Sequence, residues 1–131
     1  MKTILVVDDN PDVILSLKTG LEENRVNYCV VGVQSGKGCF EFLENNSLPD
    51  IILLDIMMPE MSGWEVFDRI KENPSWNTIS VIFLTARTDR IAKNAGGFLG
   101  DDYIEKPFEI ADVATRINNV LKKNSNMRKK I

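Results

Sequence analysis

The sequence has no histidine among its 131 residues. This absence excludes general acid–base catalysis by an imidazole, the Ser-His and Cys-His nucleophile pairs, and zinc sites with histidine ligands. The chain also cannot itself be a phosphohistidine carrier. Its two cysteines, Cys29 and Cys39, are too few for a zinc site of the Cys/His kind. We expect both to be reduced and to pack as small hydrophobic residues.

Long hydrophobic runs are also missing. No stretch approaches the ~18 consecutive apolar residues that a membrane-spanning helix needs. The apolar run at residues 4–7 is followed at once by two aspartates, a pattern that does not favour a signal peptide. We therefore expect a cytoplasmic protein with no membrane partner. The length and the hydrophobic fraction of 44% are typical of one globular domain.

Positive charge is scarce in most of the chain. The sequence has 16 basic and 19 acidic residues, for a net charge of −3. Residues 122–131 contain five of the basic residues and no acid, so the remainder is more acidic than the whole. An acidic body argues against direct binding of nucleic acid. We expect one domain over residues 1–122, followed by a short, basic and frayed tail over residues 123–131.

Short apolar runs alternate with amphipathic stretches along the chain. The apolar runs predict five strands, at residues 4–7, 30–33, 51–54, 81–84 and 103–105. Apolar residues at helical spacing predict the helices between and after them; they are Val13, Ile14, Leu17 and Leu21, then Phe40 and Leu43, then Val66, Phe67 and Ile70, then Ile110, Val113, Ala114, Ile117, Val120 and Leu121. This alternation predicts an α/β fold, with a parallel sheet that carries helices on both faces.

Local signals mark where some helices begin and end. Ser62 and Glu65 match the capping box that opens a helix. The prediction is weakest for a fourth helix over residues 89–99. That segment contains Gly96 and Gly97, and a glycine inside a helix costs about 1 kcal/mol relative to alanine. We expect this helix to be short or distorted.

Polar residues follow the predicted strands at the ends where ligands bind in such sheets. These residues are Asp8 and Asp9 after the first strand, Asp55 after the third, Thr85 after the fourth and Lys106 after the fifth. Each alone could be an ordinary turn or strand-end residue. Together they bring three carboxylates and a lysine to one rim. Two carboxylates ~5 Å apart repel by roughly 3 kcal/mol at an effective dielectric constant of ~20. Such a cluster must protonate, spread apart or bind a cation, and oxygen ligands favour Mg²⁺.

Four segments stand in order at the predicted strand ends: residues 4–10 (ILVVDDN), 49–59 (PDIILLDIMMP) together with Gly63, 83–86 (FLTA) and 101–108 (DDYIEKPF). In these four segments the chain resembles the receiver domains of two-component response regulators. Each segment is a weak signal alone, but four in order at strand ends are specific. The resemblance covers residues 2–122. It implies a single doubly wound domain whose five-stranded parallel sheet has the flavodoxin-like order 2-1-3-4-5.

The resemblance also implies a role for each matching residue. Asp55 resembles the phosphoacceptor, Thr85 the residue that binds a phosphoryl oxygen, and Lys106 the residue that neutralises another. Tyr103 resembles the aromatic residue that swings inward together with Thr85 on activation. The Lys106–Pro107 peptide bond would be cis. These roles agree with physical expectation, because phosphoryl transfer depends mostly on positioning and on neutralisation of charge.

A metal site is implied at the same rim. Asp8, Asp9 and Asp55 resemble the acidic residues that hold Mg²⁺, with the backbone carbonyl of Met57 as a further ligand. The metal would balance charge on the transferring oxygens.

By resemblance the chain is a switch and not a turnover enzyme, although it would catalyse its own phosphorylation and dephosphorylation. The donor would be a sensor histidine kinase, a phosphotransfer protein or a small acyl phosphate, and the signal would pass to a downstream effector protein. The sequence leaves open a phosphorylation-dependent homodimer. It also leaves open whether the receiver stands alone or belongs to a longer hybrid kinase or transcriptional regulator.

Two other classes of function compete with this interpretation. A hydrolase that uses Asp55 as a transient nucleophile would need an aspartate two residues later, where Met57 stands. A docking module that is independent of phosphorylation would not need the acidic residues, Thr85 and Lys106.

The chain departs from the receiver pattern in two places. The spacing from Thr85 to Lys106 is one residue shorter than the resemblance leads us to expect, and Ser80 stands where proline is common. The shortening falls near the predicted fourth helix, so it leaves the usual signalling and dimerisation face in question and not the rim. Met57 and Arg87 flank the expected path of a hydrolytic water. They predict a long-lived phosphorylated form, unless both side chains simply point into solvent.

Overall fold

A computed structural model describes residues 1–24, 27–86 and 101–129. Its elements are β1 (Lys2–Val7), α1 (Pro11–Asn24), β2 (Tyr28–Val33), α2 (Gly36–Asn45), β3 (Ile51–Asp55), α3 (Gly63–Glu72), β4 (Ser80–Ala86), β5 (Asp102–Lys106) and α5 (Ile110–Lys129). All five predicted strands are present, each slightly longer than predicted. The strands form one parallel sheet in the order β2-β1-β3-β4-β5, which confirms the predicted fold class.

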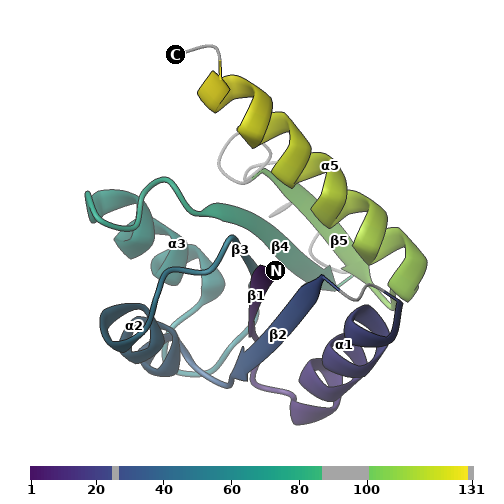
Figure 1. The fold of residues 1–131 in the computed structure, drawn as a ribbon. Helices are drawn as coiled ribbons and strands as arrows, with labels where there is room; N and C mark the ends of the chain where they lie inside the picture. The colour runs from purple at the N-terminus through teal and green to yellow at the C-terminus, as the bar shows by residue number, and fades with distance from the viewer. Residues whose placement is uncertain (25–26, 87–100, 130–131) are drawn as a thin grey trace.

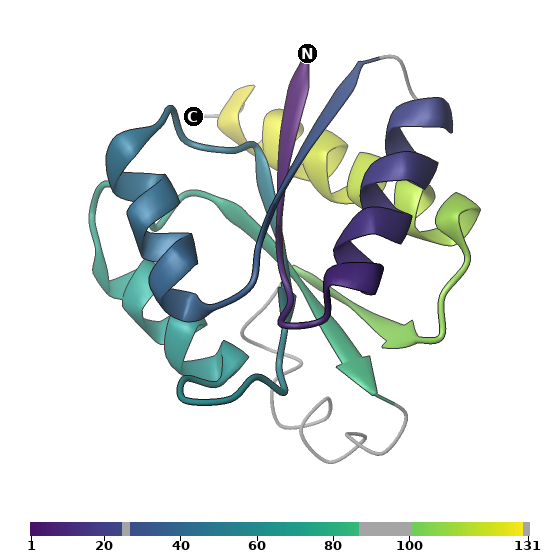
Figure 2. The same ribbon diagram turned by 90° about the horizontal axis from the view of Figure 1, so that it is seen from below.

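The helices cover both faces of the sheet, as Figures 1 and 2 show: α1 and α5 lie on one face, and α2 and α3 lie on the other. Each face has its own hydrophobic core. Leu17 of α1 and Ile117 of α5 belong to the first core, while Leu43 of α2 and Ile70 of α3 belong to the second. All four side chains are almost completely buried. The apolar residues predicted at helical spacing are thus the ones that pack against the two faces of the sheet.

Three adjacent strands form the centre of the sheet and position its functional rim. Every residue of β3 is buried, and so are residues 4–7 of β1 and 80–85 of β4. Strands covered on both faces are largely apolar, which explains why these runs lack polar alternation; their buried polar residues, Asp55, Ser80 and Thr85, lie at or next to strand ends. In the register, Val7 lies beside Leu54 and Asp55 beside Leu84. The residues that follow β1 and β3 are therefore brought together at one end of the sheet.

Serine side chains fix the starts of two helices on one face. Ser62 Oγ accepts a hydrogen bond of 3.3 Å from the backbone N–H of Glu65, and Ser35 Oγ accepts one of 3.0 Å from that of Gly38. The predicted N-cap at Ser62 is therefore confirmed. The Glu65 carboxylate, which a capping box would direct back toward Ser62, instead pairs with Arg69 at 3.2 Å.

The backbone is helical through Lys129, so α5 extends beyond residue 122 into the segment for which we expect a frayed tail, and the fraying itself stays a prediction. The Asn124 side chain donates a hydrogen bond to Ser80 Oγ at the start of β4. This contact holds the last turns of α5 against the sheet. It also gives a physical role to Ser80, a residue that the resemblance marked only as a departure.

Some predictions fall on residues that the structure does not describe, and others can be compared with it. The predicted helix at residues 89–99 and Arg87 lie outside the described residues. Among the described residues, no helix is both long and apolar enough to cross a lipid bilayer. Cys29 is partly buried and Cys39 fully buried, and both are free thiols. Burial raises the pKa of the Cys39 thiol to about 12, which makes it unreactive.

Candidate functional site

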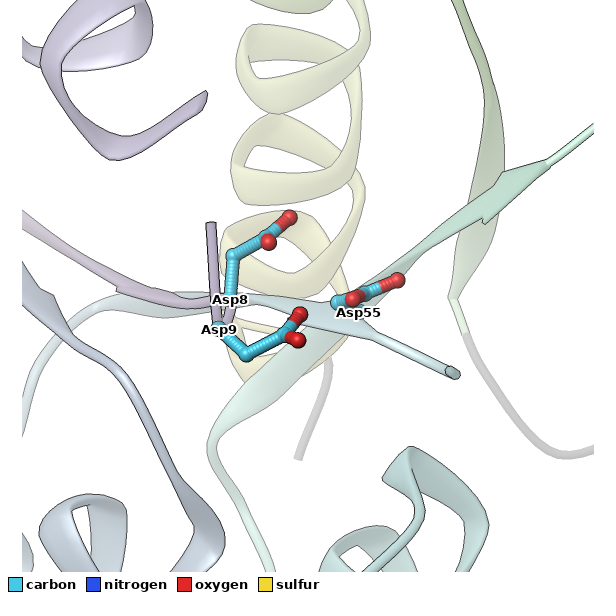
Figure 3. Close-up of side chains that lie close together, drawn as sticks. All are labelled: Asp8, Asp9 and Asp55. Atoms are coloured by element: carbon cyan, nitrogen blue, oxygen red, sulfur yellow. The ribbon is translucent and has the colours of Figure 1, made fainter. Parts of the chain in front are cut away.

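Three carboxylates meet at the carboxyl ends of β1 and β3 (Figure 3). Asp8 and Asp9 directly follow β1, and Asp55 is the last residue of β3. One oxygen from each carboxylate lies within 4.8 Å of those from the other two. Asp8 is fully buried, Asp55 is 5% exposed, and Asp9 is exposed. The structure therefore brings together the three aspartates that the sequence predicted as metal ligands.

Lys106 reaches this cluster from the end of β5. Its Nζ lies 2.8 Å from Asp8 Oδ2 and 3.4 Å from Asp55 Oδ1. Burial lowers the pKa of Lys106, but the hydrogen bond to Asp8 and the charges of Asp55 and Asp8 outweigh it, so the pKa is raised overall. The lysine is therefore a permanent cation at neutral pH. The peptide bond from Lys106 to Pro107 is cis, as the resemblance implied.

Asp55 is held in an environment that disfavours its charge. Its burial and the nearby charge of Asp8 raise its pKa to about 6, although Lys106 and a backbone hydrogen bond from Met57 oppose this rise. One lysine thus does not compensate the buried carboxylates. The donors are all carboxylate oxygens, so the residues present fit a hard divalent cation such as Mg²⁺.

The contacts of Asp55 leave one of its two oxygens uncommitted. Oδ1 lies near both Lys106 Nζ and the backbone N–H of Met57, each at 3.4 Å. Among the described residues, Oδ2 has no such partner. Both oxygens of Asp8 are used: Oδ1 accepts from the backbone N–H of Asn10 at 2.9 Å, and Oδ2 accepts from Lys106. Within the described part of the chain, the buried carboxylate with a free oxygen at this rim is therefore that of Asp55.

Thr85 lies on the strand beside Asp55. In the register of β3 and β4, Asp55 is paired with Leu84, so Thr85 is one residue further along. Thr85 is 1% exposed, and its hydroxyl oxygen has no hydrogen-bond partner among the described residues. A buried hydroxyl without a partner costs roughly 1–3 kcal/mol. This hydroxyl is available to a ligand that brings an acceptor oxygen.

Tyr103 is already buried in this structure. It lies beside Phe83 in the register of β4 and β5, and the two rings stack with centroids 5.4 Å apart. Phe83 also packs against Trp64 of α3, at 4.7 Å between ring centroids. The resemblance implies no role for Phe83. Strand alternation gives a usable signal, because residues two apart on a strand face the same side, and Phe83 precedes Thr85 by two.

The loop after Asp55 brings Met57 and α3 to the same rim. Met57 donates its backbone N–H toward Asp55, while its side chain is 65% exposed. Glu60 has a positive φ of 68°, and the N–H of Met61 bonds to the carbonyl of Pro59 at 2.7 Å, which forms a tight turn. That the Met57 carbonyl binds a metal remains a prediction.

Comparison with known proteins agrees with this geometry. The family model described as the response regulator receiver domain matches residues 4–118. The chain is 42% identical over 120 residues to a protein named probable cyclic di-GMP phosphodiesterase from Vibrio cholerae, covering 91% of this chain and 26% of that protein. It is 37% identical over 122 residues to the response regulator SaeR of Staphylococcus aureus, covering 92% of this chain and 51% of SaeR.

A third relative, histidine kinase P4 of Formosa agariphila, is 34% identical over 129 residues, covering 98% of this chain and 9% of the kinase. The chain thus spans about half or less of the length of these curated relatives.

Solved structures show the same similarity. The signal receiver domain of a signal transduction histidine kinase from Syntrophus aciditrophicus superposes with a TM-score of 0.81 at 32% identity, covering 94% of this chain and 92% of that chain. A response regulator receiver domain protein from Clostridium thermocellum gives a TM-score of 0.82 at 28% identity, covering 97% and 99%.

Proposed function

This chain belongs to the response regulator receiver family of two-component signalling, and from that premise we propose that Asp55 accepts a phosphoryl group in a Mg²⁺-dependent reaction. The observation that carries the proposal is the arrangement around Asp55. Its buried carboxylate contacts a lysine, adjoins two further aspartates, and keeps one oxygen free of partners among the residues that the structure describes.

The free oxygen of Asp55 is the nucleophile in this proposal. Its attack forms an oxygen–phosphorus bond, while the bond from phosphorus to the donor breaks and the donor keeps the electron pair. A carboxylate is a weak nucleophile, but phosphoryl transfer depends mainly on alignment and on charge. The raised pKa of Asp55, about 6, still leaves it ionised at neutral pH.

The surrounding residues would hold the phosphoryl group. Lys106 is already drawn to Asp55 Oδ1 at 3.4 Å and would neutralise a phosphoryl oxygen. The unpartnered hydroxyl of Thr85 would donate to another. Asp8, Asp9 and Asp55, with the Met57 carbonyl, would bind Mg²⁺, which supplies charge neutralisation and orientation when bound. Tyr103 would act with Thr85 as the conformational switch.

The product is an acyl phosphate, whose phosphoryl group carries roughly two negative charges in place of the single charge of the Asp55 carboxylate. We propose that it shifts the population of conformations and so signals to an effector protein. In this account the chain is a switch in the cytoplasm and not a turnover enzyme. Its donor is a sensor histidine kinase, a phosphotransfer protein or a small acyl phosphate. The similar region belongs to longer relatives that are named as a phosphodiesterase, a histidine kinase and a response regulator. Since the same kind of domain occurs in proteins with different names, we propose that the output of this chain depends on its partner protein or on an attached domain.

Intact-mass spectrometry after incubation with acetyl phosphate and Mg²⁺ tests this proposal against its two alternatives. A phosphorylation switch gains the mass of one phosphoryl group in a lasting adduct. A hydrolase would consume acetyl phosphate in many turnovers without a lasting adduct. A docking module would show neither. The same incubation with EDTA in place of Mg²⁺ is the matched control, and the adduct should be absent there.

A further inference from the structure

The first residue of α3 packs directly on the backbone of Asp55. The N–H of Gly63 donates a hydrogen bond of 2.8 Å to the carbonyl of Ile56. A Cβ placed on Gly63 would lie 2.3 Å from the carbonyl oxygen of Asp55, 2.8 Å from Cα of Ile56 and 3.0 Å from the carbonyl carbon of Asp55. Only a residue without a side chain allows this approach.

Gly63 differs in this respect from other glycines of the chain. A Cβ on Gly20 would meet side-chain carbons of Ile110, at 2.6 Å or more, and one on Gly36 would meet the side chains of Met61 and Val66. A neighbouring side chain can repack around a new methyl group at some cost in stability, whereas backbone atoms cannot rotate aside. The atoms that face Gly63 all belong to backbone, so a methyl group there must move the helix or the peptide that follows Asp55.

That peptide has little freedom to move. On its other side the N–H of Ile56 donates a hydrogen bond of 3.2 Å to the carbonyl of Leu84 in β4. The peptide between Asp55 and Ile56 is therefore held between a central strand and the first turn of α3. The helix is itself anchored in the core, because Val66 and Ile70 are fully buried. Any shift at this contact moves Cα of Asp55 and with it the direction of the carboxylate.

We infer that Gly63 is a positioning residue for phosphorylation: by letting α3 pack on the peptide after Asp55, it sets the orientation of the acceptor carboxylate. The inference rests on the proposed function of Asp55. It also identifies α3 as an element whose displacement changes the reactivity of the rim. A partner that moves the first turn of α3 would therefore tune phosphorylation without touching Asp8, Asp9 or Lys106.

The test compares Gly63→Ala with Gly20→Ala. The second variant adds the same methyl group in α1, where it meets the side chain of Ile110 and not backbone. Phosphorylation of the full chain is followed by intact mass over a range of acetyl phosphate concentrations at saturating Mg²⁺, and each variant is melted to quantify its stability. A misplacement of about 1 Å can cost on the order of 100-fold in rate. We expect Gly63→Ala to lower the saturating rate about tenfold or more, with an unchanged half-saturating donor concentration. Gly20→Ala should keep the rate of the native chain.

A second readout needs neither metal nor donor. In metal-free protein, the backbone amide NMR signals of Ile56 and Met57 should shift in Gly63→Ala and stay in place in Gly20→Ala. Equal saturating rates in Gly63→Ala and the native chain, or losses in both variants that merely follow their stability, would overturn the inference. If the native chain takes up no phosphoryl group, the proposed function fails, and the amide shifts alone then decide whether Gly63 positions Asp55.

Should Gly63→Ala not fold, Ser62→Ala tests the same contact. It removes the hydroxyl that caps the first turn of α3 and adds no atom that could clash. A lowered saturating rate in folded Ser62→Ala supports the inference, and an unchanged rate contradicts it.

Discussion

The Nζ of Lys106 lies 3.4 Å from Oδ1 of Asp55, although β4 separates the strands that carry the two residues. The same ammonium group is 2.8 Å from Asp8 Oδ2. One cation therefore serves two carboxylates that are almost completely buried. This part of the rim therefore has more negative than positive charge before any ligand binds.

Removal of the lysine charge should destabilise the metal-free domain. Lys106→Met leaves the fully buried Asp8 without its cation, and the loss of one partner of a buried pair costs about 3 kcal/mol in the free energy of unfolding. Urea denaturation in EDTA measures this change. Lys18→Met is the matched control, because Lys18 and Glu22 form an exposed pair worth at most about 0.5 kcal/mol. Similar losses in the two variants would show that Lys106 is only a surface lysine.

The pH dependence of the free energy of unfolding should show that the folded state disfavours the charge of Asp55. The folded-state pKa of Asp55 is about 6, above its ordinary value of 3.8, so the folded protein binds the proton more tightly than the unfolded chain. Stability should therefore fall as the pH rises from about 4 to beyond 6. Asp55→Asn removes this penalty and should be more stable than the native chain at pH 7 by roughly 3 kcal/mol.

Thermal denaturation in EDTA at a series of pH values measures the stability of the native chain and of Asp55→Asn. The advantage of Asp55→Asn should shrink as the pH falls and disappear at about pH 3, below the ordinary pKa of 3.8, where Asp55 is protonated in both the folded and the unfolded state. An advantage that stays constant across this range would mean that the charge of Asp55 is not its cause.

Magnesium should stabilise the native domain, because a ligand that binds only the folded state raises the melting temperature. Asp9→Ala should weaken this effect, since the exposed carboxylate of Asp9 belongs to the acidic cluster. Asp68→Ala, which removes an equally exposed acid from α3, should respond to Mg²⁺ like the native chain. The response of each protein is measured by titrating Mg²⁺ and following the melting temperature of the native chain, Asp9→Ala and Asp68→Ala. No response of the native chain to millimolar Mg²⁺ would remove the metal site from this account.

The exposed side chain of Met57 should influence how long the phosphoryl group lasts. It stands two residues after Asp55 with 65% of its surface exposed, so it can be replaced without disturbing the core. We predict that Met57→Asn dephosphorylates faster, because a small polar group can orient water toward the acyl phosphate. Leu15→Asn, a similar change at an exposed position of α1, should leave the decay unchanged. Equal decay rates for Met57→Asn and the native chain would contradict a role for Met57.

The sequence predicted those features that depend on strand ends. Once residues 4–7 and 51–54 are recognised as buried parallel strands, Asp8, Asp9 and Asp55 must share a rim, and the structure confirms that they do. The features that it did not predict depend on packing between distant elements. The hydrogen bond from Asn124 in α5 to Ser80 in β4 joins residues 44 positions apart, and no local pattern near residue 124 indicates it. The contact of Gly63 with the backbone of Asp55 likewise appears only when α3 is placed against β3.

The most direct test of the central claim is the intact mass of the native chain and of Asp55→Asn after the same incubation with acetyl phosphate and Mg²⁺. The amide has nearly the same shape as the carboxylate but is not a nucleophile, so the fold should persist, which circular dichroism can verify. The account predicts a single phosphoryl adduct on the native chain and none on Asp55→Asn. An adduct of equal extent on both proteins would place the phosphoryl group on another residue and contradict the account.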